Sequence, residues 1–210
     1  DLHLRISLEA LLIEGRQYYL EIPPVQDCES NWSDSDTLII AQPSWPEKND
    51  LVINEILFDA KEGSVDFIEI INRSDKVLDI CDLIIAKGQK DSIRKHYPLC
   101  SESELILPGE IVVFCGNKEL LEKHYSIKTN NILEVNAFPD FPVAREVVTL
   151  LNKSLQEVDQ LAYSGQMHFE VLNDTKGVSL ERVHPDMKTD HPDNWASASA
   201  SVNYSTPGLK

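Results

Sequence analysis

Apolar and polar positions alternate most clearly between residues 51 and 72. Residues 52–58 alternate around two central polar positions, and residues 67–71 place β-branched and aromatic side chains around one glutamate. Both patterns are typical of half-buried strands. The segment that joins them carries a glycine and a serine among acidic residues, which predicts a loop.

Two carboxylates, Glu55 and Glu69, lie within these apolar strands. Burying a carboxylate is costly unless it is paired with a cation or accepts hydrogen bonds. We therefore expect each of the two glutamates to anchor a neighbouring loop.

Short apolar segments separated by turn signals continue along the chain. Residues 111–115 are apolar on both faces and predict a central core strand, and Asn117 is suited to cap a short helix over residues 118–125. Further strands are predicted at residues 1–8, 17–22, 37–41, 77–80, 83–86, 146–151, 158–163 and 177–183. Many short strands, close turns and little helix together predict an all-β sandwich.

A polar stretch with two prolines, residues 43–50, has the composition of a linker between domains. We place a boundary there, with a partial β segment over residues 1–45 and a second domain over residues 46–210. Three strands are too few to close a sandwich. The first segment is therefore completed by residues upstream of this sequence or by strand exchange with another chain, or its strands dock on the domain that follows. The strand-like start of the sequence favours a fragment of a longer precursor.

Two separated motifs resemble the lamin tail domain family, and in particular its bacterial members. The first motif is NEIL, a short acidic loop and DFIEIIN, and the second is GVSLERVHPD over residues 177–186, followed by Trp195 and by STPG over residues 205–208. This resemblance covers about residues 50–210. It implies an immunoglobulin-like β-sandwich with a helical insertion, and it implies a secreted or surface-exposed protein.

The preceding residues carry a second resemblance. Residues 11–31, LLIEGRQYYLEIPPVQDCESN, resemble the C-terminal part of bacterial immunoglobulin-like domains of surface proteins. This likeness also implies an extracellular or cell-surface location.

The net charge of −16, from 35 acidic and 19 basic residues, argues against a nucleic-acid partner, because such partners require clustered lysine and arginine. The one local basic cluster spans residues 87–95. A glycan partner requires exposed aromatic platforms, for which Trp32, Trp45 and Tyr204 are candidates. Trp45 has a second interpretation, packing at the domain junction, and Trp195 is expected in the core.

Four cysteines stand at positions 28, 81, 100 and 115 without zinc-finger spacing. Cys81 and Cys115 each end an apolar strand, which favours buried thiols. A disulfide that involves Cys100, in its polar loop, is the alternative in an oxidising compartment. No run of about 18 apolar residues is present, so no membrane span is predicted.

Motifs for catalysis are absent from the sequence: it contains no HExxH, no GxSxG and no glycine-rich phosphate loop. No cofactor is predicted. The metal candidates are two groups of carboxylates and imidazoles, for calcium in the first loop and for zinc or calcium near the end of the chain. These candidates are Asp59, Glu62, Asp66, His184, Asp190 and His191. The alternative for both groups is a solvated loop.

A loop over residues 130–144 contains Phe138, Asp140 and Phe141 between prolines. These side chains form either a recognition surface or, as we expect, a cover over the end of the sandwich.

We expect a non-enzymatic module of a bacterial secreted or cell-surface protein, contributing adhesion, presentation or domain spacing to an unknown protein or glycan ligand. The alternative is an accessory domain of an extracellular nuclease or polysaccharide-acting enzyme whose catalytic domain lies outside this chain. A catalytic metal site between His184 and Asp193 is a third hypothesis.

Overall fold

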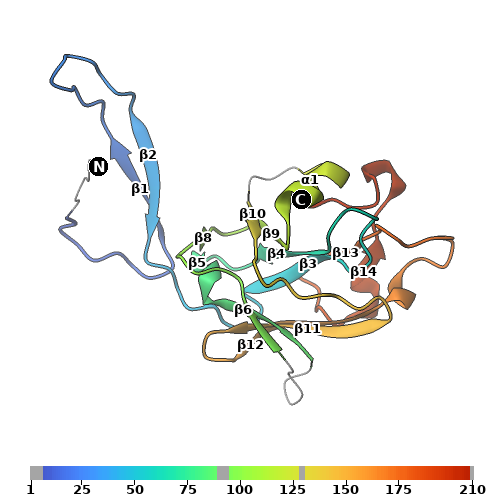
Figure 1. Ribbon diagram of the computed structural model, residues 1–210. Helices are drawn as coiled ribbons and strands as arrows, with labels where there is room; N and C mark the ends of the chain where they lie inside the picture. Colours follow the sequence, from blue (N-terminus) through green and yellow to red (C-terminus); the bar gives the residue numbers. More distant parts are fainter. Residues whose placement is uncertain (1–6, 89–94, 128–130, 209–210) are drawn as a thin grey trace.

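A computed structural model describes residues 7–88, 95–127 and 131–208, and Figure 1 shows their arrangement. The protein is all-β with one α-helix, α1 (Lys118–His124), in the described residues. Its strands are β1 (Gln17–Ile22), β2 (Asp36–Ala41), β3 (Leu51–Leu57), β4 (Phe67–Asn72), β5 (Leu78–Asp79), β6 (Leu83–Lys87), β7 (Lys95–Pro98), β8 (Leu105–Ile106), β9 (Ile111–Cys115), β10 (Ile132–Glu134), β11 (Arg145–Asn152), β12 (Glu157–Ser164), β13 (Leu180–Arg182) and β14 (Trp195–Ser197).

Two larger sheets pack face to face as a sandwich (Figure 1). One has the strand order β10-β9-β4-β3-β13-β14 and the other the order β12-β11-β6-β7. Ile53, Ile70 and Phe114 from the first sheet share one buried cluster with Ile85 and Leu150 from the second. The predicted all-β sandwich is therefore confirmed, because alternate positions of both sheets turn their apolar side chains into one core.

The predicted core strand and the predicted helix are both confirmed. All five residues of β9 are buried, and the strand pairs with β10 on one side and β4 on the other. The side chain of Asn117 caps α1 by accepting a hydrogen bond from the backbone N–H of Leu120 at 2.9 Å. Leu121 of this helix packs on Phe67 and Val113, so α1 covers part of the outer face of the six-stranded sheet.

Two strands are shorter than the sequence pattern predicts. Of residues 77–80, only β5 is extended, because the side chain of Asp79 accepts a hydrogen bond from the Cys81 N–H and starts a 3-10 turn. Of residues 177–183, only β13 is extended, because Gly177 has a φ of +77° and occupies a turn. The short strands β7, β8, β10 and β14 were not predicted, since two to four residues are too few for a visible alternation.

The N-terminal part of the chain is a hairpin that extends away from the sandwich (Figure 1). The predicted strands at 17–22 and 37–41 are confirmed as β1 and β2, which pair antiparallel. Of the predicted strand at 1–8, residues 1–6 lie outside the described part, and residues 7 and 8 are not in a strand. The domain boundary near residue 45 stays a prediction.

The proline-containing stretch after the hairpin is fastened to the sandwich. The backbone N–H of Ser44 donates to the Val77 carbonyl at 2.9 Å, and the side-chain amide of Asn152 donates to the Pro46 carbonyl at 3.1 Å. Pro46 is buried. These contacts set where the hairpin leaves the sandwich.

The expectation that Glu55 and Glu69 anchor loops is confirmed. Glu55 is 1% exposed and accepts hydrogen bonds from the Ser205 hydroxyl and the Thr206 backbone N–H, and Glu69 is 0% exposed and accepts one from the Gly208 backbone N–H. The last described residues are therefore held on the outer face of the six-stranded sheet.

We expect Phe114→Ala to lower the free energy of unfolding by about 3 to 5 kcal/mol, because it removes a fully buried aromatic side chain from the core. Phe169→Ala is the matched control, since Phe169 is 54% exposed, and it should change stability little. Urea unfolding followed by circular dichroism measures both. Equal losses in the two variants would contradict this assignment of the core.

Candidate functional site

The hairpin exposes apolar and aromatic side chains. Tyr19 and Trp32 are 67% and 66% exposed, and Leu38 and Ile39 of β2 are also exposed. Within the described residues β1 and β2 pair only with each other, so each keeps one open edge. An isolated two-stranded ribbon is marginally stable, and open edges readily accept a further strand.

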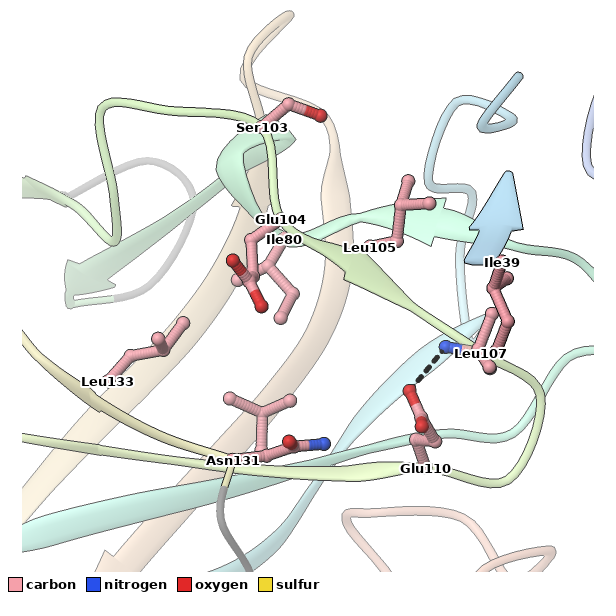
Figure 2. A pocket seen from close by; sticks show the side chains of 10 residues that line it. Ile39, Ile80, Ser103, Glu104, Leu105, Leu107, Glu110, Asn131 and Leu133 are labelled. Atoms are coloured by element: carbon pink, nitrogen blue, oxygen red, sulfur yellow. Dashed lines mark hydrogen bonds between the residues drawn. The ribbon is translucent and has the colours of Figure 1, made fainter. Parts of the chain in front are cut away.

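A pocket of about 270 Å³ lies where the hairpin meets the sandwich. Its apolar wall comes from Ile39 of β2, Leu105 of β8, Leu107, Val112 of β9 and Leu133 of β10. Figure 2 shows the Ile39 and Leu107 side chains next to each other in this view, at the hairpin end of the pocket. The pocket is therefore shared by the hairpin and the rim of the sandwich.

Two carboxylates, an amide and the Ser103 hydroxyl supply the polar groups of this pocket. Glu104, Glu110 and Asn131 all line it, and Figure 2 shows the Asn131 amide between the two carboxylates in this view. One oxygen of Glu110 accepts a hydrogen bond from the Leu107 backbone N–H at 2.8 Å, which orients that carboxylate. Apolar walls with carboxylates suit a ligand that combines a cation with an apolar body.

A disulfide and an aspartate shape the loop that brings Glu104 to the pocket. Cys81 and Cys100 are disulfide-bonded. The carboxylate of Asp79 accepts hydrogen bonds from the Ser103 hydroxyl at 2.6 Å and from the Glu104 backbone N–H at 3.1 Å. The loop is thus held at both ends against the 3-10 turn that follows β5.

The disulfide also corrects one expectation about the cysteines. Cys81 is not a free thiol, and the alternative of a disulfide that involves Cys100 is confirmed. Cys115 is a buried free thiol as expected, and burial raises the pKa of this thiol to about 11. Cys28 is free and exposed.

The acidic loop after β3 carries the three predicted calcium ligands, Asp59, Glu62 and Asp66, and the structure brings only two of them together. Asp59 and Asp66 line one open hollow together with Asp140, but Glu62 is exposed and does not line it. Asp66 accepts a hydrogen bond from the Ala60 backbone N–H at 3.1 Å, and burial raises the pKa of this carboxyl to about 6. In the described ranges no three histidine, cysteine or acidic side chains are grouped to hold a metal ion.

The residues predicted for a metal site near the end of the chain lie in separate turns. His184 accepts a hydrogen bond from the Asp186 backbone N–H through Nδ1, and His191 accepts one from the Asp193 backbone N–H in the same way, both at 3.2 Å. Asp190 lines a different, polar hollow. The structure does not assemble these side chains into one centre, so nothing in their geometry favours the catalytic metal hypothesis.

A buried polar network in this region was missed by the sequence patterns. Arg182 donates to the Ile53 carbonyl at 2.7 Å and to the Thr189 hydroxyl at 2.6 Å, and the Thr189 hydroxyl donates to Asp159 at 2.5 Å. The Trp195 indole N–H donates to the Thr189 carbonyl at 2.8 Å. The network ties the segment before β14 to the sandwich, and the expected core position of Trp195 is confirmed.

The other candidate side chains divide between core and surface. Trp32 is exposed, Trp45 is 40% exposed and packs only in part, and Tyr204 is half-buried. Phe141 is buried with its ring edge on Tyr163, which confirms that this loop covers an end of the sandwich.

The basic side chains in the described part of the predicted cluster, Lys87 and Lys95, already contact other residues of the chain. Lys87 contacts the carbonyl and carboxylate of Asp140, and the ammonium group of Lys95 lies over the Tyr97 ring. Residues 89–94 of this cluster lie outside the described residues. The geometry does not add support for a nucleic-acid surface.

No protein-family model matches the chain, and no curated protein matches it either. No helix in the described part of the chain is long and apolar enough to cross a membrane.

We expect the double variant Cys81→Ser/Cys100→Ser to lower the free energy of unfolding by about 2 to 4 kcal/mol, because the disulfide constrains the unfolded chain. It should also loosen the loop that carries Glu104. Cys28→Ser, at the exposed free cysteine, is the control and should leave stability unchanged. Thermal unfolding without reductant makes the comparison, and an unchanged midpoint in the double variant would contradict the structural role of the disulfide.

Proposed function

We propose that the chain is a non-enzymatic binding module of a bacterial secreted or cell-surface protein, and that it binds a protein partner through the hairpin and the adjoining pocket. The observation that carries this proposal is the hairpin itself: a two-stranded ribbon with open edges and exposed apolar side chains, set beside a pocket on a rigid sandwich. The resemblance of the two separated motifs, over residues 54–72 and 177–208, to bacterial lamin tail domains supports the same role.

The covalent chemistry of the chain supports an extracellular location. A stable disulfide forms and persists in oxidising compartments and is rare in a reducing cytosol. The Cys81–Cys100 bond therefore favours a secreted or surface-exposed setting. The acidic net charge of −16 keeps such a module soluble and repels acidic surfaces.

The form of the partner follows from the site. An extended peptide adds to an open strand edge through backbone hydrogen bonds, and its alternate side chains fill neighbouring pockets. The pocket places Glu104 and Glu110 near an apolar wall, so the side chain it takes is a lysine or arginine, whose long stem packs on apolar surface while its charge meets a carboxylate. The partner segment is therefore an extended strand with alternating apolar residues and one basic residue.

Trp32 favours the alternative function. An indole ring that is 66% exposed near the tip of a hairpin is the kind of platform on which a sugar ring stacks. An accessory domain of a polysaccharide-acting enzyme would use that side chain, whereas a strand-binding module would use Ile39 and the two pocket glutamates.

The test measures binding of the chain to arrays of short extended peptides and of glycans. We expect binding to peptides that alternate apolar and polar residues, and stronger binding to those that contain a lysine. Glu104→Gln/Glu110→Gln should weaken binding to the lysine-containing peptides by about tenfold, because the charge pairing is lost. Glu62→Gln removes an exposed glutamate from another loop and serves as the control.

Equal binding by the double variant and the control would contradict the role of the pocket. Absence of peptide binding, together with glycan binding that Trp32→Ala abolishes, would contradict the proposal and support the accessory-domain alternative.

A further inference from the structure

Three glutamates form a row across adjacent strands of the six-stranded sheet. Glu69 of β4 pairs directly with Glu55 of β3, and Glu55 pairs directly with Glu181 of β13. Directly paired residues project from the same face of a sheet with their Cβ atoms about 4.5 to 5.5 Å apart. Like charges at such positions destabilise the sheet.

The C-terminal segment, residues 203–208, lies on this row and bonds to each member. Glu55 accepts hydrogen bonds from the Ser205 hydroxyl at 2.9 Å and the Thr206 N–H at 3.0 Å. The Thr206 hydroxyl donates to Glu181 at 2.5 Å. The Gly208 N–H donates to Glu69 at 2.6 Å. A single short segment is therefore bound by all three carboxyl groups.

The sheet supplies two more donors to the row. The Ser179 hydroxyl donates to Glu55 at 2.5 Å, and the Asn54 amide donates to Glu69 at 2.7 Å. All of these donors are neutral.

The charged and titratable groups around the row leave its negative charge unbalanced. Lys61, on the loop after β3, bonds to the Asn203 amide oxygen and lies over the ring of Tyr125, at the end of α1. Arg182 donates instead to the Ile53 carbonyl and contacts Asp159. In the described part of the chain no lysine, arginine or histidine nitrogen is paired with Glu55, Glu69 or Glu181.

Burial and the charge of neighbouring carboxylates raise the pKa of two members of the row, Glu55 and Glu69. Burial raises the pKa of Glu55 to about 7, and the charge of Glu181 acts in the same direction. Burial also raises the pKa of Glu69 to about 8, and the neighbouring Glu55 adds to the rise. The hydrogen bonds from the C-terminal segment lower both values and do not cancel the effect of burial.

We propose that the Glu69–Glu55–Glu181 row is a proton-dependent clasp that holds residues 203–208 on the sheet while Glu55 or Glu69 retains a proton and releases them when both of these carboxyl groups are ionised. This inference does not depend on the binding function proposed above.

Proton linkage gives the direction of the effect. The docked segment removes Glu55 and Glu69 from water, so the docked state binds protons more tightly than the released state. A group whose pKa is raised on docking favours docking fully below its free pKa, here 4.5, and that advantage is lost as pH rises through the docked values of about 7 and 8. Docking therefore weakens as pH rises from about 4.5 to about 8.

Release would change the surface beside the row. A hollow of about 550 Å³ lies there, with Ile71, Ile111, Val183 and Val202 in its apolar wall and Glu55 and Thr206 at its side. Thr206 leaves this wall if the segment departs, so the hollow opens onto Glu55 and Glu181, which also line it. The clasp thus connects external pH to the exposure of this face.

The test is amide hydrogen exchange of the whole chain between about pH 6 and pH 9, expressed as protection factors so that the intrinsic pH dependence of exchange is removed. The reporters are the N–H groups of Thr206 and Gly208, which bond to the row. We expect their protection to fall by up to about a thousandfold across this range, since each pH unit below the docked pKa of a group contributes up to about tenfold and pH 6 lies one unit below the value of Glu55 and two below that of Glu69. Protection in β9 should change little.

Glu69→Gln keeps the shape of the side chain and removes its charge, so the fall should shrink to about tenfold or less. Glu181→Gln also removes a charge from the row and should reduce the fall in protection. This variant provides the test if Glu69→Gln does not fold. Glu62→Gln, at an exposed glutamate, should behave as the wild-type chain does. Constant protection in the wild-type chain, an equal fall in all variants, or an equal fall in β9 would overturn the clasp.

Discussion

The burial of two paired carboxylates determines which groups can cover the outer face of the six-stranded sheet. Glu55 and Glu69 stand opposite each other on β3 and β4, and apart from one asparagine in each strand the other positions are apolar. Neither is stable under a layer of protein without donors, so the chain must supply them. The C-terminal residues do this with hydroxyl and backbone N–H groups. The closing segment is thereby attached by polar bonds to a face that α1 covers by apolar packing.

The region where the hairpin joins the sandwich is held together by different interactions. The sandwich there is held by its core and by the Cys81–Cys100 disulfide, whereas the hairpin is joined to it through the fastened stretch around Pro46. The rim of the sandwich and the two-stranded ribbon beside it combine a pocket with open strand edges, the features on which the proposed binding of a partner depends. The proposed binding at the hairpin and the proposed proton-dependent clasp at the C-terminal segment thus involve separate parts of the structure.

The features that the sequence predicted are those set by local pattern. The alternation in β3 and β4, the all-apolar β9 and the Asn117 cap are properties of neighbouring residues, and all were predicted correctly. The role of Glu55 and Glu69 as anchors also followed from their apolar surroundings. The features missed depend on distant residues: the pocket draws its walls from several strands, and Arg182 finds its partners on three segments. No spacing along the chain signals such contacts.

The most direct measurement of the central claim is the titration of the Glu55 and Glu69 side-chain carboxyl carbons by NMR in the intact chain. The buried row predicts that at least one of the two carboxyl groups titrates near pH 7 to 8, with the midpoint falling when Glu181 is replaced by glutamine. Midpoints near 4.5 for both groups would show that both carboxyl groups are fully ionised at neutral pH, and would contradict the claim that burial raises their pKa values.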